Sequence, residues 1–255
     1  MRYAMVLARV AFGFFVIAAL IGLAASAGTR LGLWNFRAGM NMLIPAVFIG
    51  AIGFVAGLVW LIGALRGNSS VGARLGFTGL IGAAVFLYFP LSAEYRGLTL
   101  PPMHDVTTDP EHAPKFVDLL PLRQGATNTP NYNGGQRVMY RGQMMTMAYM
   151  QHKYYPELAK PMALLEPRDR LYWHAFETAK AMGWHVLTPG AAAKAAGRIE
   201  ATDTSFWFGE ISDIVIRVKQ AGTLGARLDI RSESRNGDTD DGDNAARIKA
   251  YMKAL

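Results

Sequence analysis

The chain of 255 residues contains no cysteine, and its first 93 residues contain no aspartate, glutamate or lysine. The absence of cysteine excludes disulfide bonds and thiol chemistry, although it does not select a cellular compartment. The only charged residues before Glu94 are six arginines, which fall between long uncharged stretches. A soluble helical core rarely stays so apolar over this length, so the amino-terminal region is expected to lie in a membrane.

Three uncharged stretches fill this region, at 10–29, 38–65 and 75–93. Each can span a bilayer, since about 20 helical residues cross roughly 30 Å of hydrocarbon. We therefore predict a transmembrane region over 1–95, with spans near 6–27, 41–64 and 75–93. Glycines at helical spacing favour a compact three-helix bundle; they are Gly53 with Gly57, and Gly72, Gly76 and Gly79. The stretches contain no Asp, Glu, His or Lys, which argues against a proton or ion path.

The arginines that flank the spans predict the orientation. If the amino terminus is cytoplasmic, four arginines lie inside and two lie outside; the inner ones are Arg2, Arg9, Arg66 and Arg74, and the outer ones are Arg30 and Arg37. An alternative is a secretory signal that is cleaved after Ala25-Ser26-Ala27, but the apolar run is long for a signal peptide. Both readings place the carboxyl-terminal portion outside, in the periplasm if the membrane is a bacterial inner membrane.

The composition changes abruptly after Glu94. Residues 96–255 have a net charge of only +2, against +7 for the whole chain. The high isoelectric point therefore reflects the membrane-flanking arginines, and gives no support for a nucleic-acid partner. About 160 residues suffice for one domain with its own core.

Local patterns predict an α+β domain in which helices cover one side of an antiparallel sheet. The segment 100–135 is rich in turn formers and should be irregular, and the Met-rich stretch 139–150 favours a core-filling helix. Asp243 or Asn244 is expected to cap a final helix. The remaining expected elements are an amphipathic helix at 167–182, strands near 184–187, 198–204, 213–219 and 227–234, and a hairpin loop at 220–225.

Alternation along the predicted hairpin separates an apolar face from a charged one. Ile214, Ile216 and Val218 share their face with Leu228 and Ile230. The other face carries Asp213, Arg217, Lys219, Arg227, Asp229, Arg231, Glu233 and Arg235. The simpler interpretation is a solvated face with cross-strand ion pairs. The sharper one is an anion-recognition surface, on which Arg217, Arg231 and Arg235 bind a phosphate or carboxylate of a lipid headgroup or acidic glycan.

Two further groups of polar residues are weak candidates for chemistry. His104, Asp105 and Asp109 offer an acid–base or metal-ligand set, but no second histidine lies at a recognised metal spacing. The carboxylates at 238–243 do not have the spacing of a calcium loop. With no cysteine and no Gly-x-Ser-x-Gly elbow, neither a metal nor a cofactor nor a nucleophile is indicated.

Several ordered motifs resemble the family known as domain of unknown function 1499 (DUF1499), which is found in bacteria and in plastid-bearing lineages. The resemblance covers about 100–255, and its motifs are PPMHDVTTD at 101–109, YPEL at 155–158, MGW at 182–184, IEATDT at 199–204, DIRSESR at 229–235 and NAARI at 244–248. It implies a common domain and association with the membrane or envelope, but no reaction. Ser212 departs from a pattern that often has an acid beside Asp213, which argues against a paired-carboxylate role there.

The polar parts of these motifs define the candidate ligand-binding site. We expect His104, Asp105, Arg217, Arg231 and Arg235 to line one pocket, with further candidates at Asp109, Asp229, Asn244 and Arg247. The favoured function is a non-catalytic envelope protein whose outward domain binds a lipid, glycan or protein partner. The alternative is a hydrolase or lyase that uses His104 with Asp105 or Asp213. A shallow groove of mixed charge would favour binding, and a buried pocket joining His104 to two carboxylates would favour catalysis.

Overall fold

The computed structural model describes residues 2–67 and 70–255. The chain divides into two compact units. Unit 1 comprises Met1–Tyr95 with Phe206–Gly209, and unit 2 comprises Arg96–Ser205 with Glu210–Leu255.

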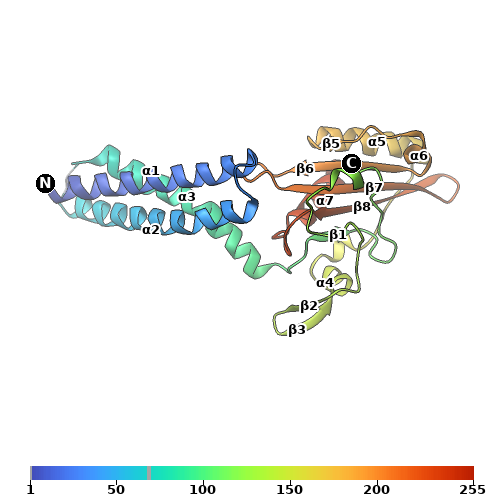
Figure 1. Cartoon of the computed structure of the whole chain (residues 1–255), viewed down its shortest axis with the longest axis horizontal. Coiled ribbons are helices and arrows are strands. Elements are labelled where there is room, and N and C mark those ends of the chain that lie inside the picture. Colours follow the sequence, from blue (N-terminus) through green and yellow to red (C-terminus); the bar gives the residue numbers. More distant parts are fainter. Residues whose placement is uncertain (1, 68–69) are drawn as a thin grey trace. The chain divides into compact units, whose positions relative to one another are not determined.

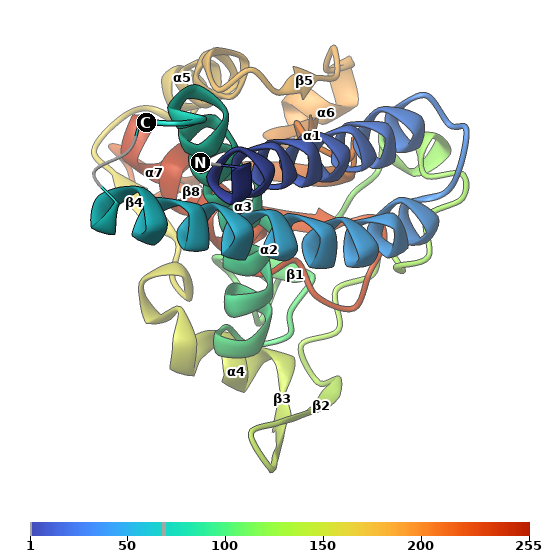
Figure 2. The same ribbon diagram turned by 90° about the vertical axis from the view of Figure 1, so that its left-hand side faces the viewer.

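Unit 1 is built from three long apolar helices, as the sequence predicts (Figures 1 and 2). They are α1 (Arg2–Arg30), α2 (Phe36–Arg66) and α3 (Ala73–Thr99), and each is long and apolar enough to cross a membrane. The helix α2 begins where the Asn35 side chain accepts a hydrogen bond from the Ala38 amide. Asn35 therefore explains why α2 begins at this point.

Glycines allow the three helices to approach closely. Gly79 of α3 lies against the α1 backbone, where an added Cβ would be 2.5 Å from the Phe12 nitrogen. Gly76 faces the Trp60 ring of α2. Gly72 does not belong to this stripe as predicted, because it precedes α3 in a turn with φ of +73°. An added Cβ at Gly72 would nevertheless be 2.7 Å from the Ala8 Cβ of α1, so the turn before α3 also packs closely on the bundle.

Unit 2 contains a six-stranded antiparallel sheet, which confirms the α+β class. The strand order is β1-β8-β7-β6-β5, and β4 also pairs with β8. The strands of this sheet are β1 (Asp105–Thr107), β4 (Met162–Leu164), β5 (His185–Val186), β6 (Arg198–Thr204), β7 (Ile211–Ala221) and β8 (Gly225–Ser234). The helices are α4 (Met147–Tyr154), α5 (Arg168–Ala181), α6 (Ala191–Ala195) and α7 (Asp243–Ala254), with short 3-10 turns η1 (Leu120–Leu122) and η2 (Pro156–Leu158).

The apolar face of the sheet is the core, and the predicted alternation of β7 and β8 is confirmed. Ile214, Ile216 and Ile230 are fully buried there, together with residues of α5 and α7. The Trp184 ring stacks on Tyr251 of α7 with ring centroids 5.1 Å apart. The start of α7 differs from the prediction, because neither Asp243 nor Asn244 caps it. The Asp240 carboxylate instead accepts from the amides of Gly242 and Asn244.

The prediction of a helix over 139–150 is wrong for its first half. Residues there form a hairpin of β2 (Arg137–Tyr140) and β3 (Gln143–Thr146), and α4 follows. Arg141 and Gly142 both have positive φ, at 49° and 74°, which suits a tight two-residue hairpin turn. Met139 and Met144 face outward from this hairpin, so these methionines do not fill the core. In Figures 1 and 2 the hairpin and α4 lie on the side of the domain away from α5.

The edge strand β1 fastens the irregular segment to the sheet. It pairs with β8 in register Asp105 to Glu233 and Thr107 to Arg231. On its other side, the buried Gln151 side chain bonds both the amide and the carbonyl of Thr107, so this edge is capped. The chain that follows β1 then runs over the charged face of the sheet, where the candidate site lies.

Candidate functional site

Most of the charged face of the sheet is buried. Asp213, Asp229 and Glu233 are 0% exposed and Arg231 is 1% exposed. The interpretation as a solvated face is therefore wrong, because segment 108–135 covers it, with Phe116 and Leu119 packed on Val215 of β7. Burial of so many charges is tolerated only where each is paired and hydrogen-bonded.

Arg231 is the centre of the first cluster. Its Nε and Nη2 donate to the two Asp105 oxygens at 2.9 and 2.8 Å, and Nη2 also donates to Glu233 Oε2 at 3.1 Å. Its Nη1 donates to the carbonyls of Pro114 and Pro130 at 3.3 and 3.0 Å. The guanidinium thus uses all of its donor nitrogens on groups of the protein, and it ties two distant parts of the covering segment to β8.

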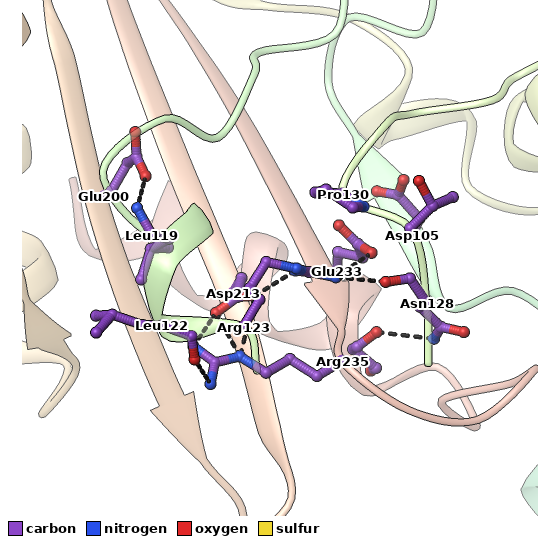
Figure 3. A network of polar contacts seen from close by, with 12 residues as sticks. Asp105, Leu119, Leu122, Arg123, Asn128, Pro130, Glu200, Asp213, Glu233 and Arg235 are labelled. Atoms are coloured by element: carbon purple, nitrogen blue, oxygen red, sulfur yellow. Dashed lines mark hydrogen bonds and ion pairs between the residues drawn. The ribbon is translucent and has the colours of Figure 1, made fainter. Parts of the chain in front are cut away.

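Arg123 holds the second cluster together (Figure 3). It reaches from the covering segment to Asp213 and to Glu233, the latter at 2.9 Å. Arg235 donates to both Asp213 oxygens and to the carbonyl of Leu122 at 2.8 Å. Asp213 therefore has a guanidinium on each side and no oxygen left for other chemistry.

A third cluster joins the covering segment to the β7–β8 pair near Asp109. Arg217 donates to Asp109 at 2.9 Å and to Asp229 at 2.7 Å, and Arg227 contacts the same two carboxylates. Burial disfavours the charge of Asp109, but the hydrogen bond from His112 and the charges of Arg227 and Arg217 outweigh it and lower the pKa of this carboxyl. Asp109 is thus held as an anion within the cluster.

Glu200 of β6 fixes the backbone of the covering segment. Its carboxylate accepts hydrogen bonds from three consecutive amides, those of Val117, Asp118 and Leu119, at 2.9, 3.1 and 2.8 Å, and Figure 3 shows the bond from Leu119. Arg198 forms ion pairs with Glu200 at 2.7 Å and with Asp118 at 3.0 Å. The segment is therefore attached to β6 as well as to β7 and β8.

The pKa of one carboxyl of this network is shifted in the opposite direction from the pKa of Asp109. Burial raises the pKa of Glu233 to about 7, and the nearby Asp105 carboxylate adds to this shift against the opposing charges of Arg231 and Arg123. Burial therefore places the titration of Glu233 near neutral pH, although both Arg231 and Arg123 pair with this carboxyl.

A groove of about 670 Å³ lies between the covering segment and the sheet. Its volume is within the range of small-molecule sites. Lys115, His112, Asn131 and Tyr132 line it from the covering segment. Its other lining residues are Glu111, Ala113, Pro114, Val117, Pro130, Ala196, Arg198, Val215, Arg217 and Arg231.

The polar groups of the groove differ in whether they already have hydrogen-bond or ion-pair partners. Arg217, Arg198 and Arg231 are already paired with carboxylates, whereas the exposed Lys115 ammonium has no ion pair or hydrogen bond within the described residues. The buried Tyr132 hydroxyl likewise lacks a hydrogen-bond partner among these residues. Burial, and then the Asp105 charge, raise the pKa of Tyr132, so this hydroxyl stays protonated as a donor.

The candidate residues from the sequence divide between several places. Arg217 and Arg231 line the groove, whereas His104 and Asp105 line a separate small pocket of about 20 Å³; Tyr132 contributes to both. Arg235 lines neither of them. Asp229 also lines neither, and it is buried in an ion pair with Arg217.

Asn244 and Arg247 lie on the helix-covered face of the sheet. Asn244 bonds the Ser232 hydroxyl at 2.6 Å and the His104 carbonyl at 2.9 Å. Arg247 pairs with Asp203 at 2.7 Å. Since Ser232 alternates with Arg231 along β8, this group lies on the opposite face from the groove.

Sequence reasoning missed Arg123, Glu200, Arg198, Lys115 and Tyr132. Alternation along β6 could have found two of them, because Arg198 and Glu200 flank the buried Ile199 and pair with Arg217 and Val215 of β7. The other three lie in the irregular segment, where no periodic signal exists. Within residues 2–67 and 70–255, no three His, Cys, Asp or Glu side chains are grouped to hold a metal ion.

Comparison with known proteins places the chain in a family and goes no further. Neither a curated protein nor a solved structure gives a significant match. The model of the family described as protein of unknown function DUF1499 matches residues 105–255, which is more than half of the chain. The resemblance carried by the sequence motifs is thereby confirmed, and the chain belongs to the DUF1499 family.

Proposed function

We propose that this protein is a membrane-anchored binding protein of the bacterial envelope, whose domain at 96–255 faces the periplasm and binds an anionic ligand in the groove. The ligand chemistry is a phosphate or carboxylate carried by a lipid headgroup or by a glycan. The observation that carries the proposal is the Lys115 ammonium, which lines the groove without a carboxylate partner among the described residues.

The composition of the groove suits such a ligand. An entering anion would meet Lys115 and the outer edges of Arg198 and Arg217, and the Tyr132 hydroxyl offers a further donor. Because the arginines are held by buried carboxylates, they are ordered before a ligand arrives, which reduces the entropy cost of binding. Apolar walls from Val117 and Val215 suit the uncharged part of the same ligand.

The geometry gives less support to a hydrolase or lyase that uses His104. A general acid or base needs a carboxylate or imidazole within reach of the proton to be moved. Both Asp105 oxygens accept from Arg231, and both Asp213 oxygens accept from arginines. The pocket that contains His104 holds about 20 Å³, which is room for little more than a water molecule.

Binding can be tested on the full chain in an uncharged detergent. Titration with dihexanoyl phosphatidylglycerol, with inorganic phosphate and with an oligogalacturonate would distinguish a lipid headgroup, a free phosphate and an acidic glycan, and dihexanoyl phosphatidylcholine serves as the zwitterionic control. We expect saturable binding of at least one anionic probe. In Lys115→Ala the affinity should fall about tenfold, because one charged hydrogen bond contributes about 1.5 kcal/mol or more.

Lys160→Ala is the matched control, since Lys160 is also an exposed lysine without a contact among the described residues and lies outside the groove. It should bind like the wild type. No saturable binding of any anionic probe, or equal loss in the two lysine variants, would contradict the proposal.

The periplasmic orientation is testable because the chain contains no cysteine. In spheroplasts, Lys160→Cys should react with a membrane-impermeant maleimide before lysis, as four inner arginines against two outer ones predict. Reaction only after lysis would show that the domain faces the cytoplasm and would contradict the predicted orientation.

A further inference from the structure

A short aromatic segment belongs to unit 1 although it is distant from the helices in sequence. Residues Phe206–Gly209 follow β6 and precede β7, yet they form one compact unit with the three apolar helices. The segment reads Phe206-Trp207-Phe208-Gly209 and contains no charge.

The backbone of this segment is hydrogen-bonded to the end of α1. The Ser26 hydroxyl donates to the Trp207 carbonyl, and Arg30 Nη1 donates to the Phe206 carbonyl. These two carbonyls therefore do not need water, which allows them to lie close to hydrocarbon.

Two of the aromatic rings are fixed against the ends of the helices. The Phe208 ring meets Phe36, at the start of α2, edge to face with centroids 5.9 Å apart. The Trp207 ring lies 5.6 Å from that of Phe89 on α3. The segment thus contacts all three helices at one end of the bundle.

The outward side of the segment is apolar and exposed. Phe206 is 78% exposed and Trp207 is 47% exposed, and the nearby α1–α2 turn exposes Leu31 and Leu33. These side chains extend the apolar surface of the helices, and Arg30 provides a cation at the same level. Tryptophan, phenylalanine and arginine together at the end of a span are the composition of the membrane–water interface.

We propose that Phe206 and Trp207 lie at the boundary between the lipid headgroups and the acyl chains. The lipid bilayer then covers this exposed apolar surface. The aromatic indole and phenyl rings bury their apolar surface among the upper acyl carbons, while Arg30 faces the lipid phosphates. A protein partner is less favoured, because the surface is continuous with helices that themselves require lipid, and residues 31–36 offer no acid for a basic partner. This inference does not depend on the ligand proposed for the groove.

The first test measures the depth of a spin label in vesicles of phosphatidylcholine and phosphatidylglycerol. Phe206→Cys and Leu224→Cys each introduce the only cysteine of the full chain, and both parent side chains are 78% exposed. For a nitroxide at 206, the accessibility to oxygen relative to that to a water-soluble nickel chelate should be several-fold higher than for one at 224. Equal ratios at the two positions would overturn the proposal.

The second test needs no label and uses tryptophans of equal exposure. Trp207 and Trp173 are 47% and 48% exposed. With brominated phosphatidylcholine in the vesicles, Trp207→Phe should lower the quenched fraction of the total fluorescence, whereas Trp173→Phe should leave it unchanged or raise it. An unchanged or raised quenched fraction in Trp207→Phe would place this ring in water and refute the inference.

Discussion

Replacing Arg231 by methionine should destabilise the domain by about 4 kcal/mol. Arg231 is 1% exposed and holds two buried carboxylates, those of Asp105 and Glu233. Without it, Asp105 loses both of its guanidinium hydrogen bonds, while Glu233 keeps Arg123. Removal of one partner of a buried ion pair costs about 3–5 kcal/mol, because the remaining charge stays buried without compensation.

The structure offers a matched arginine for comparison. Arg227 is also paired with two carboxylates, but its side chain is 38% exposed and both Asp109 and Asp229 retain Arg217 when it is removed. Arg227→Met should therefore cost about 1 kcal/mol or less. The comparison distinguishes the cost of leaving a buried carboxylate without its partner from the cost of losing an arginine side chain.

The assay is thermal unfolding of the full chain in an uncharged detergent, followed by near-ultraviolet circular dichroism. For a domain of this size, about 4 kcal/mol corresponds to a midpoint lowered by about 8–16 °C. Adding Asp105→Asn to Arg231→Met should recover part of the loss, because the orphaned charge is removed. If Arg231→Met lowers the midpoint no more than Arg227→Met does, the covering segment is not held by this buried cluster and the reasoning is refuted.

Two further predictions concern one titrating group and one helix contact. Because burial raises the pKa of Glu233 to about 7 from its ordinary value of 4.5, the folded state retains a proton that the unfolded state releases, and the free energy of unfolding should fall as pH rises from about 4.5 to 7. Glu233→Gln should remove up to about 3 kcal/mol of this pH dependence in denaturant titrations at several pH values, and an unchanged profile would assign it to another group. Gly79→Ala should weaken the helix bundle and lower its resistance to sodium dodecyl sulfate, since the added Cβ would be 2.5 Å from a backbone nitrogen of α1. Gly13→Ala is its control because nothing lies within 4 Å of the added Cβ; equal behaviour of the two variants would show that α1 and α3 do not pack at Gly79.

The three apolar helices and the sheet were predictable because each rests on a local pattern. Absence of charge over about 20 residues is sufficient to indicate a span, and the two-residue alternation of β7 and β8 identified the core side at Ile214 and Ile230. The prediction failed for the first half of the Met-rich stretch, because methionine fits a helix or a hairpin equally. The informative signal there was Arg141 with Gly142, a pair suited to positive φ, and not the methionines themselves.

The burial of the charged face could not be predicted from alternation. Alternation shows that Asp213 and Arg231 share a side of the sheet, but not what covers that side. The cover is an irregular segment whose contacts are remote in sequence; Arg123 meets Asp213 across 90 residues and Pro114 meets Arg231 across 117. The mixture of signs on the strands was compatible with ion pairs in water as well as with ion pairs under a cover.

The ion pairs also change where a ligand should be sought. The motifs by which the chain resembles its family contain Asp105, Asp109, Asp229, Arg231 and Glu233, and each of these side chains is engaged in the ion pairs on the covered face of the sheet. Such residues explain a common fold without any contact to a ligand. Recognition would then fall to residues on the groove wall, chiefly Lys115, His112 and the outer edge of Arg198.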